Sequence, residues 1–201
     1  STNTQTYVGS SQFILANPGV YIRLDDSTES LGITPSAGYT SSNIPIENYF
    51  QESGYEFSVS LKYTRSPTGG AGDASIFAIK GDKSGQSTYF KIWVDGGILF
   101  VGGSNIFWEV SFDTEYRLLV TYKDTGTVLY GKLFNNTTNT LVSEVTVTQS
   151  LFGTDSPTGT HSGWYIGGGE GWQPWQHFVG SINDIYTSNT ILTWENVTSR
   201  D

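Results

Sequence analysis

Two tryptophans in a short glycine- and proline-containing segment are the residues of this sequence best suited to holding a ligand. Trp172 and Trp175 flank Pro174, directly after a run of glycines. An indole can stack on the apolar C–H face of a pyranose, and neighbouring polar groups can bind its hydroxyls. Such groups surround both rings: Glu170, Gln173, Gln176 and His177. The segment predicts a ligand platform, and the alternative is that one indole folds back as a lid on the core.

The other four tryptophans have less specific surroundings. Trp108 follows Asn105 by three residues, and this pair is a second candidate binding region, because Trp108 could belong either to the core or to a groove. Trp93 and Trp164 lie inside apolar runs, so both are predicted to be core residues. Trp194 is predicted to pack a C-terminal turn against the rest of the chain.

The composition favours strands over helices. The 201 residues include 12 Tyr, 11 Phe and 6 Trp, which suit strands, and 24 Gly, which suit turns. No stretch of the sequence keeps apolar residues at the i, i+3, i+4 and i+7 spacing of an amphipathic helix over three turns. We therefore expect one all-β domain over residues 1–201, an antiparallel β-sandwich of the jelly-roll type with little helix. The polar residues 1–11 are expected to fray.

The charge argues against two classes of partner. Ten basic residues (Lys+Arg 10) against 19 acidic ones give a net charge of −9, whereas nucleic acids and anionic membranes attract clustered Lys and Arg. No apolar stretch is long enough to insert into a bilayer. The polar, weakly charged composition suits an extracellular module or one on a cell or virion surface. Because the chain lacks Met, we expect it to be a mature or excised part of a larger or oligomeric protein.

Alternation of apolar and polar residues places the expected strands. They span residues 12–16, 20–24, 31–33, 55–63, 74–80, 89–94, 98–101, 106–111, 116–123, 127–134, 140–148, 164–166 and 178–185. A hairpin is expected across residues 95–97, and a single helical turn is expected after Thr193 as N-cap. The residues predicted to face the core are Tyr55, Phe57, Val59, Leu61, Leu118, Val120, Tyr122 and Ile182.

Four segments, in their order along the chain, carry a resemblance to a known family. They are Tyr21 to Ile33, Tyr55 to Leu61, Tyr116 to Phe134 and Tyr165 to Ile185, the last with its Ile166-Gly167-Gly168-Gly169 corner. Together they resemble a laminin-G-like domain of the concanavalin A-like lectin and glucanase superfamily. The resemblance covers roughly residues 20 to 187 and implies a concanavalin A-like sandwich, but it says little about the ligand.

The resemblance raises two questions of chemistry. Glycosidases of the superfamily use paired carboxylates on one strand. Glu109, Asp113 and Glu115 are separated by even numbers of residues, so on a single strand they would point to the same face, but their spacing departs from the family's pattern. No catalytic residue is therefore predicted. Residues 113–115 are instead expected to form a turn. Some members bind Ca²⁺ at the rim, and the loop carboxylates with suitable chemistry are Asp73, Asp82, Asp124 and Asp155. Each of these residues also suits an ordinary turn, so no cofactor is expected, and binding of Ca²⁺ is kept as an alternative.

The histidines add no catalytic pattern, since His161 and His177 form neither a triad nor a metal motif. The leading prediction is therefore a non-catalytic glycan-binding module of a larger secreted, adhesin or viral attachment protein. A protein-binding adhesion or structural module is the first alternative, and a glycoside hydrolase or polysaccharide lyase is the second.

Overall fold

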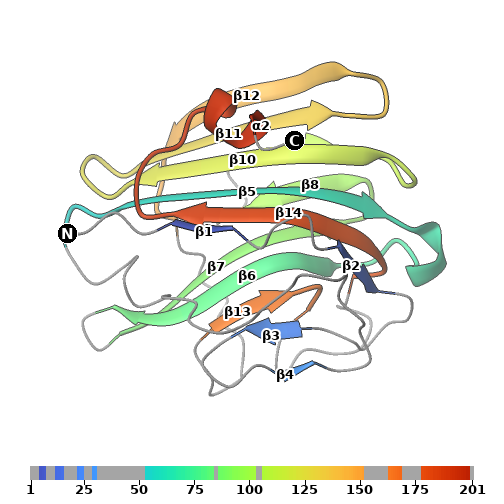
Figure 1. Cartoon of the computed structure of the whole chain (residues 1–201), viewed down its shortest axis with the longest axis horizontal. Helices are drawn as coiled ribbons and strands as arrows, with labels where there is room; N and C mark the ends of the chain where they lie inside the picture. Colours follow the sequence, from blue (N-terminus) through green and yellow to red (C-terminus); the bar gives the residue numbers. More distant parts are fainter. Residues whose placement is uncertain are drawn as a thin grey trace.

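The strands of this protein form two sheets that lie face to face (Figure 1). The computed structural model describes residues 5–7, 12–15, 22–24, 29–30, 53–83, 86–102, 106–151, 163–168 and 178–199. The first sheet has the order β1-β14-β5-β10-β11-β12, with β2 also paired to β14. The second sheet has the order β4-β3-β13-β6-β7-β8-β9.

The strands follow one another closely along the chain. Those of the first sheet are β1 (Gln5–Tyr7), β2 (Gln12–Leu15), β5 (Glu56–Arg65), β10 (Glu115–Lys123), β11 (Val128–Asn135), β12 (Thr140–Thr148) and β14 (Gly180–Ser188). Those of the second sheet are β3 (Ile22–Leu24), β4 (Glu29–Ser30), β6 (Ala74–Lys83), β7 (Gln86–Asp95), β8 (Ile98–Val101), β9 (Ile106–Glu109) and β13 (Gly163–Ile166). The helices in the described part of the chain are the 3₁₀ turn η1 (Pro67–Gly69) and the short α2 (Trp194–Thr198).

Every strand pair described is antiparallel. The expected fold class, an antiparallel β-sandwich with little helix, is therefore confirmed. No helix among the described residues has the length and apolar character needed to cross a membrane.

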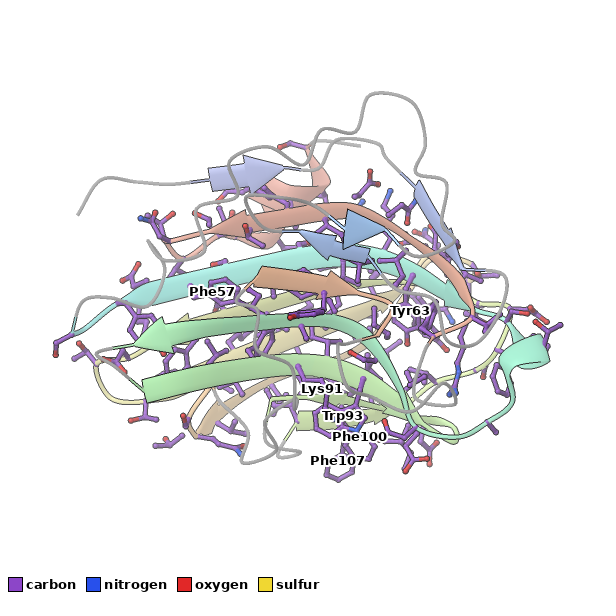
Figure 2. All side chains as sticks on the ribbon, turned by 90° about the horizontal axis from the view of Figure 1, so that it is seen from below. Phe57, Tyr63, Lys91, Trp93, Phe100 and Phe107 are labelled. Atoms are coloured by element: carbon purple, nitrogen blue, oxygen red, sulfur yellow. The ribbon has the colours of Figure 1, made fainter. Side chains whose placement is uncertain are left out.

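The core lies between the two sheets, because alternate residues of each long strand point inward. Phe57 of β5 meets Phe90 of β7 edge-on, with ring centroids 5.9 Å apart, and Figure 2 shows Phe57 and Tyr63 between the layers. All eight residues predicted to face the core are buried there: Tyr55, Phe57, Val59, Leu61, Leu118, Val120, Tyr122 and Ile182.

Alternation predicts that the face of β5 carrying Ser58 and Ser60 is exposed to solvent, and this prediction is wrong. Ser58 and Ser60 are fully buried. The Ser58 hydroxyl donates to the Thr190 carbonyl (2.7 Å) and accepts from the Leu192 N–H (3.0 Å). A second apolar cluster forms beneath this C-terminal segment, made of Leu119, Tyr186, Leu192 and Val197. Ser58, which resembles part of a solvated face in the sequence, therefore anchors the end of the chain.

The C-terminal turn forms as predicted. Thr193 caps α2, since its hydroxyl accepts from the Asn196 N–H (3.2 Å) while the Asn196 side chain accepts from the Thr193 N–H (2.9 Å). Trp194 packs on the sandwich beside Phe134, with ring centroids 6.0 Å apart. Lys132 lies over the same indole at 4.5 Å.

Three local expectations need correction. Gln5–Tyr7 is not frayed but pairs with β14, since an added strand gives its backbone hydrogen-bond partners. The sequence predicts a turn over residues 81–85, but β6 runs to Lys83 and β7 starts at Gln86, so the turn is shorter. A bulge at Asp184, whose φ is 52°, interrupts the alternation of β14 so that Ile182 and Ile185 both enter the core.

Candidate functional site

Three aromatic rings stand in one row on the outer face of the second sheet. Trp93 of β7 is paired with Phe100 of β8, and Phe100 is paired with Phe107 of β9. The inward residues of these strands, such as Ile92, fill the core, so the three rings must point outward. Figure 2 shows them in line below the sheet, with Phe107 furthest out. We call Trp93, Phe100 and Phe107 the aromatic row.

The rings of the aromatic row contact one another across the strands. Trp93 and Phe100 are stacked, with centroids 5.1 Å apart and planes inclined by 17°. Phe100 and Phe107 are tilted at 6.4 Å. The Lys91 ammonium lies 4.3 Å from the Trp93 ring, a cation–π contact. Because Lys91 and Phe100 both lie against the indole, Phe107 has the most surface left for a partner, and it is 61% exposed.

Charged side chains border the aromatic row on both sides. Lys91 precedes Trp93 by two residues on the same face of β7. On the other side, Asp95 follows Trp93 by two residues and Glu109 follows Phe107 by two residues, so both lie on the same face as the rings. Both carboxylates are exposed, and both residues are paired with Ile98 of β8. The face therefore offers apolar rings between a cation and two carboxylates, a combination that can stack a ligand and bind its polar groups.

The placement of Trp93 corrects the prediction that it is a core residue. Its side chain is half-buried on the outer face, while Ile92 and Val94 point inward. The sequence held the signal, because the two-residue Gly96-Gly97 turn pairs Asp95 with Ile98 and hence Trp93 with Phe100. Phe100 and Phe107 are not among the residues predicted from the sequence, although the register that places Trp93 outward also places both of them outward.

The residues predicted to bind ligand fall mostly outside the described part of the chain. This holds for Trp172, Trp175, Gln173, Gln176, His177, Glu170 and Asn105, so the loop platform stays a prediction. The strand entering its glycine corner is confirmed, since β13 ends at Ile166 and Gly167 has a φ of 80°. The Trp164 side chain also lies outside the described residues.

Trp108, which could belong either to the core or to a groove, lies in the core. It is 7% exposed and belongs to the main core cluster. The indole packs on the backbone of β11 in the opposite sheet, because a Cβ added to Gly131 would lie 2.8 Å from its Cη2. Trp108 is therefore not available to a ligand in a surface groove.

The three carboxylates considered for catalysis do not lie on one strand. Glu109 ends β9 in the second sheet and Glu115 begins β10 in the first. Asp113, with a φ of 54°, lies in the connecting turn, as predicted. Glu115 accepts a hydrogen bond from the Asn136 amide at 2.9 Å. The arrangement departs from the paired carboxylates of glycosidases, which share a strand.

Metal sites in proteins gather several ligand side chains, and the described residues hold no such cluster. Within them, no three His, Cys, Asp or Glu side chains gather as a metal site would require. Asp124 begins the turn between β10 and β11, as predicted, since its carbonyl accepts the Thr127 N–H at 3.1 Å; its carboxylate also accepts the Gly54 N–H at 2.9 Å. Asp155 and the side chain of Asp82 lie outside the described residues.

Comparison with known proteins places the fold. No family model matches the chain, and no curated protein matches it. Among solved structures it is similar to the CBM40 of the Ruminococcus gnavus IT-sialidase bound to α2,3-sialyllactose, with a TM-score of 0.55 and 11% identity over 98% of this chain and 96% of that one.

Two further structures show the same likeness. A leech intramolecular trans-sialidase matches with a TM-score of 0.58 and 15% identity, over 98% of this chain and 27% of that one. The basic winged bean lectin with Tn-antigen matches with a TM-score of 0.53 and 10% identity, over 93% of this chain and 98% of that one. At such identities the likeness establishes the fold alone: this chain has the two-sheet antiparallel β-sandwich seen in these structures.

Proposed function

We propose that this chain is a non-catalytic glycan-binding module of the laminin-G-like type. The observation that carries the proposal is the aromatic row, in which an exposed Phe107 ends a stack of rings between Lys91 and two carboxylates. Aromatic surface of this kind stacks on sugar C–H faces, and charged groups at its edge bind hydroxyls. The similar CBM40 and winged bean lectin were solved with sialyllactose and Tn-antigen, which supports a glycan as the ligand class.

Binding is the whole activity in this proposal. The candidate carboxylates are divided between two sheets, so no acid–nucleophile pair is assigned. Such a module works outside the cell or on a cell or virion surface, within a larger or oligomeric protein whose several copies strengthen weak single-site binding. The loop with Trp172 and Trp175 is proposed as a second platform.

A glycan array followed by titration of its best hit tests the proposal. Phe107→Ala is expected to weaken binding by roughly ten-fold, the loss of about 1–1.5 kcal/mol from one aromatic contact. Leu141→Ala is the matched control, because Leu141 is an exposed apolar residue, 53% exposed, on β12 of the other sheet. Both variants should keep the wild-type melting temperature, since both side chains are largely exposed.

The outcomes separate the alternatives. Wild-type affinity in Phe107→Ala, together with a loss in Trp172→Ala or Trp175→Ala, would move the site to the loop. An array without hits, combined with capture of a defined protein ligand that depends on Phe107, would favour the protein-binding alternative. Release of reducing sugar from polysaccharides would contradict the non-catalytic assignment.

A further inference from the structure

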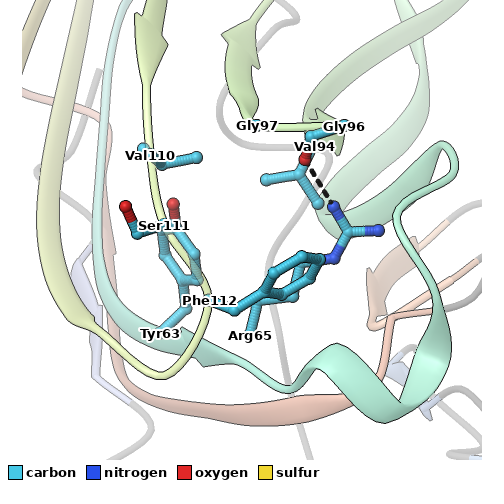
Figure 3. Close-up of a pocket in the computed structure, with 8 residues that line it drawn as sticks. All are labelled: Tyr63, Arg65, Val94, Gly96, Gly97, Val110, Ser111 and Phe112. Atoms are coloured by element: carbon cyan, nitrogen blue, oxygen red, sulfur yellow. Dashed lines mark hydrogen bonds between the residues drawn. The ribbon is translucent and has the colours of Figure 1, made fainter.

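A pocket opens at one end of the sandwich, beside the β7–β8 hairpin that carries two rings of the aromatic row. Its volume is about 280 Å³, just below the roughly 300–1,000 Å³ of typical ligand pockets. Figure 3 shows its lining residues: Tyr63, Arg65, Val94, Gly96, Gly97, Val110, Ser111 and Phe112. The space suits one small sugar or one substituent of a larger glycan.

The pocket has a buried floor and an accessible rim. Tyr63, Arg65 and Val94 are at most 5% exposed, whereas Gly97 and Ser111 are exposed. Backbone hydrogen bonds fix the rim, since the Val110 N–H donates to the Gly97 carbonyl at 2.8 Å. The Ser111 N–H donates to the Tyr116 hydroxyl at 2.9 Å. The walls are therefore preorganised, which lowers the entropic cost of binding.

One polar group in this floor has no hydrogen-bond partner within the described part of the chain. The Tyr63 hydroxyl is buried and makes no hydrogen bond to the described residues. Leaving a buried hydroxyl unsatisfied is unfavourable, and such groups in native structures call for a ligand or a water molecule. A ligand atom that accepts a hydrogen bond would satisfy this group.

The Arg65 guanidinium, in contrast, already has partners. It donates to the Gly96 carbonyl at 3.1 Å and to the Gly72 carbonyl, and it lies 5.2 Å from the centre of the Phe112 ring. Burial lowers the pKa of Arg65, and the carboxylates of Asp95 and Asp73 oppose that shift. Because the charge of Arg65 is already balanced by the carboxylates of Asp95 and Asp73, we expect the pocket to bind a neutral ligand in preference to an anion.

We propose that this pocket holds the acetamido group of an N-acetylated sugar, whose carbonyl oxygen accepts a hydrogen bond from the Tyr63 hydroxyl. The methyl group of the acetamide then lies against Val94 and Val110, which supply the apolar wall. The sugar part of this inference rests on the proposed function. The preference for a neutral acetamide rests on the pocket alone and can be measured without a sugar.

The first experiment titrates the intact chain with N-methylacetamide and, separately, with acetate, an anion of similar size. The methyl NMR signals of Val94 and Val110 report on the pocket. N-methylacetamide is expected to shift them and acetate is not. Equal shifts with both compounds would overturn the inference. So would the absence of any shift at the highest N-methylacetamide concentration that leaves the protein folded.

Two variants test the residues. Tyr63→Phe removes only the hydroxyl and is expected to weaken N-methylacetamide binding by about three- to ten-fold, the loss of one neutral hydrogen bond. Tyr130→Phe, on β11 and outside the pocket, is the matched control and should bind as wild type does. Ser111→Phe closes the exposed rim without removing the Ser111 backbone hydrogen bond and should abolish binding. Unchanged binding in Tyr63→Phe or Ser111→Phe would contradict the assignment.

The sugar step uses N-acetylglucosamine against glucose. Pocket signals that shift only with the acetylated sugar support the full inference. If N-methylacetamide binds but no glycan does, the proposed function fails while the acetamide pocket stands. If glycans bind through Phe107 while the pocket signals stay fixed with every compound, the pocket inference fails and the proposed function stands.

Discussion

Replacing Gly131 with alanine should destabilise the protein through a single contact in the core. Gly131 lies on β11 between Val120 and Val145. An added Cβ would lie 2.8 Å from Trp108 Cη2 and 3.4 Å from Ile106 Cδ1. Because Trp108 comes from the opposite sheet, the indole or the sheet spacing must shift. Overpacking of this kind costs about 1–3 kcal/mol, and removing a strand glycine returns roughly 0.5–1 kcal/mol.

The expected net loss of unfolding free energy is about 1–2 kcal/mol, or roughly 2–8 °C in melting temperature for a chain of this size. Urea denaturation followed by tryptophan fluorescence measures it. Gly72→Ala is the matched control, because Gly72 is exposed and its added Cβ would meet nothing within 4 Å. That variant should stay within about 0.5 kcal/mol of wild type.

A double-mutant cycle assigns the loss to the indole. Trp108→Phe removes the outer carbons of the indole that meet the new Cβ, so Gly131→Ala should cost less in that background, with a coupling of at least about 0.5 kcal/mol. Additive effects, or a Gly131→Ala variant as stable as Gly72→Ala, would refute the reasoning. Trp108 would then have to lie elsewhere, and its candidacy for a surface groove would return.

Three further predictions concern stability. Val120→Asp should leave the chain unfolded by circular dichroism, because an unpaired carboxylate in this fully buried position costs several kcal/mol; a near-native melting temperature would mean that the register of β10 is wrong by one residue. Thr193→Ala removes the cap of α2 and should cost about 1 kcal/mol in urea, whereas unchanged stability would show that the C-terminal segment is held by Leu192 and Val197 alone. Burial raises the pKa of Tyr63 well above its usual value, so the folded state keeps a proton that the unfolded state releases above pH ~10; unfolding free energy should fall there by about 1.4 kcal/mol per pH unit from this group, and Tyr63→Phe should lack that contribution in high-pH denaturation.

Alternation predicted the inner faces of the strands well because one physical cause acts along each of them. A strand with one face on the core repeats every two residues, and every second residue of β5 and β10 belongs to the main core cluster. The glycine turn at residues 96–97 likewise fixed the β7–β8 hairpin. Local chemistry was sufficient wherever a strand was regular and its turn was short.

The exceptions arise from contacts that are distant in the sequence. Alternation predicts that Ser58 faces solvent, but this residue is buried and hydrogen-bonded to a segment more than a hundred residues later in the chain. The bulge at Asp184 is another case, since this residue has a positive φ and its carboxylate forms an ion pair at 2.9 Å with Lys62 of the neighbouring β5. Alternation every two residues predicts Ile185 on the face opposite Ile182, and this prediction is wrong because a period of two cannot foresee an inserted residue.

The aromatic row depends on register more than on composition. Phe107 and Trp108 are adjacent in β9, yet one is 61% exposed and the other 7% exposed. A slip of one residue would exchange them, because successive side chains point to opposite faces. The pairing of Phe107 with Phe100 and of Phe100 with Trp93 fixes which ring is outward. Gly131 fixes it from the other side, because only a residue without a Cβ leaves room for the indole of Trp108. The glycine that admits Trp108 to the core therefore also keeps Phe107 on the surface, so the core contact and the proposed glycan site are set by one and the same register.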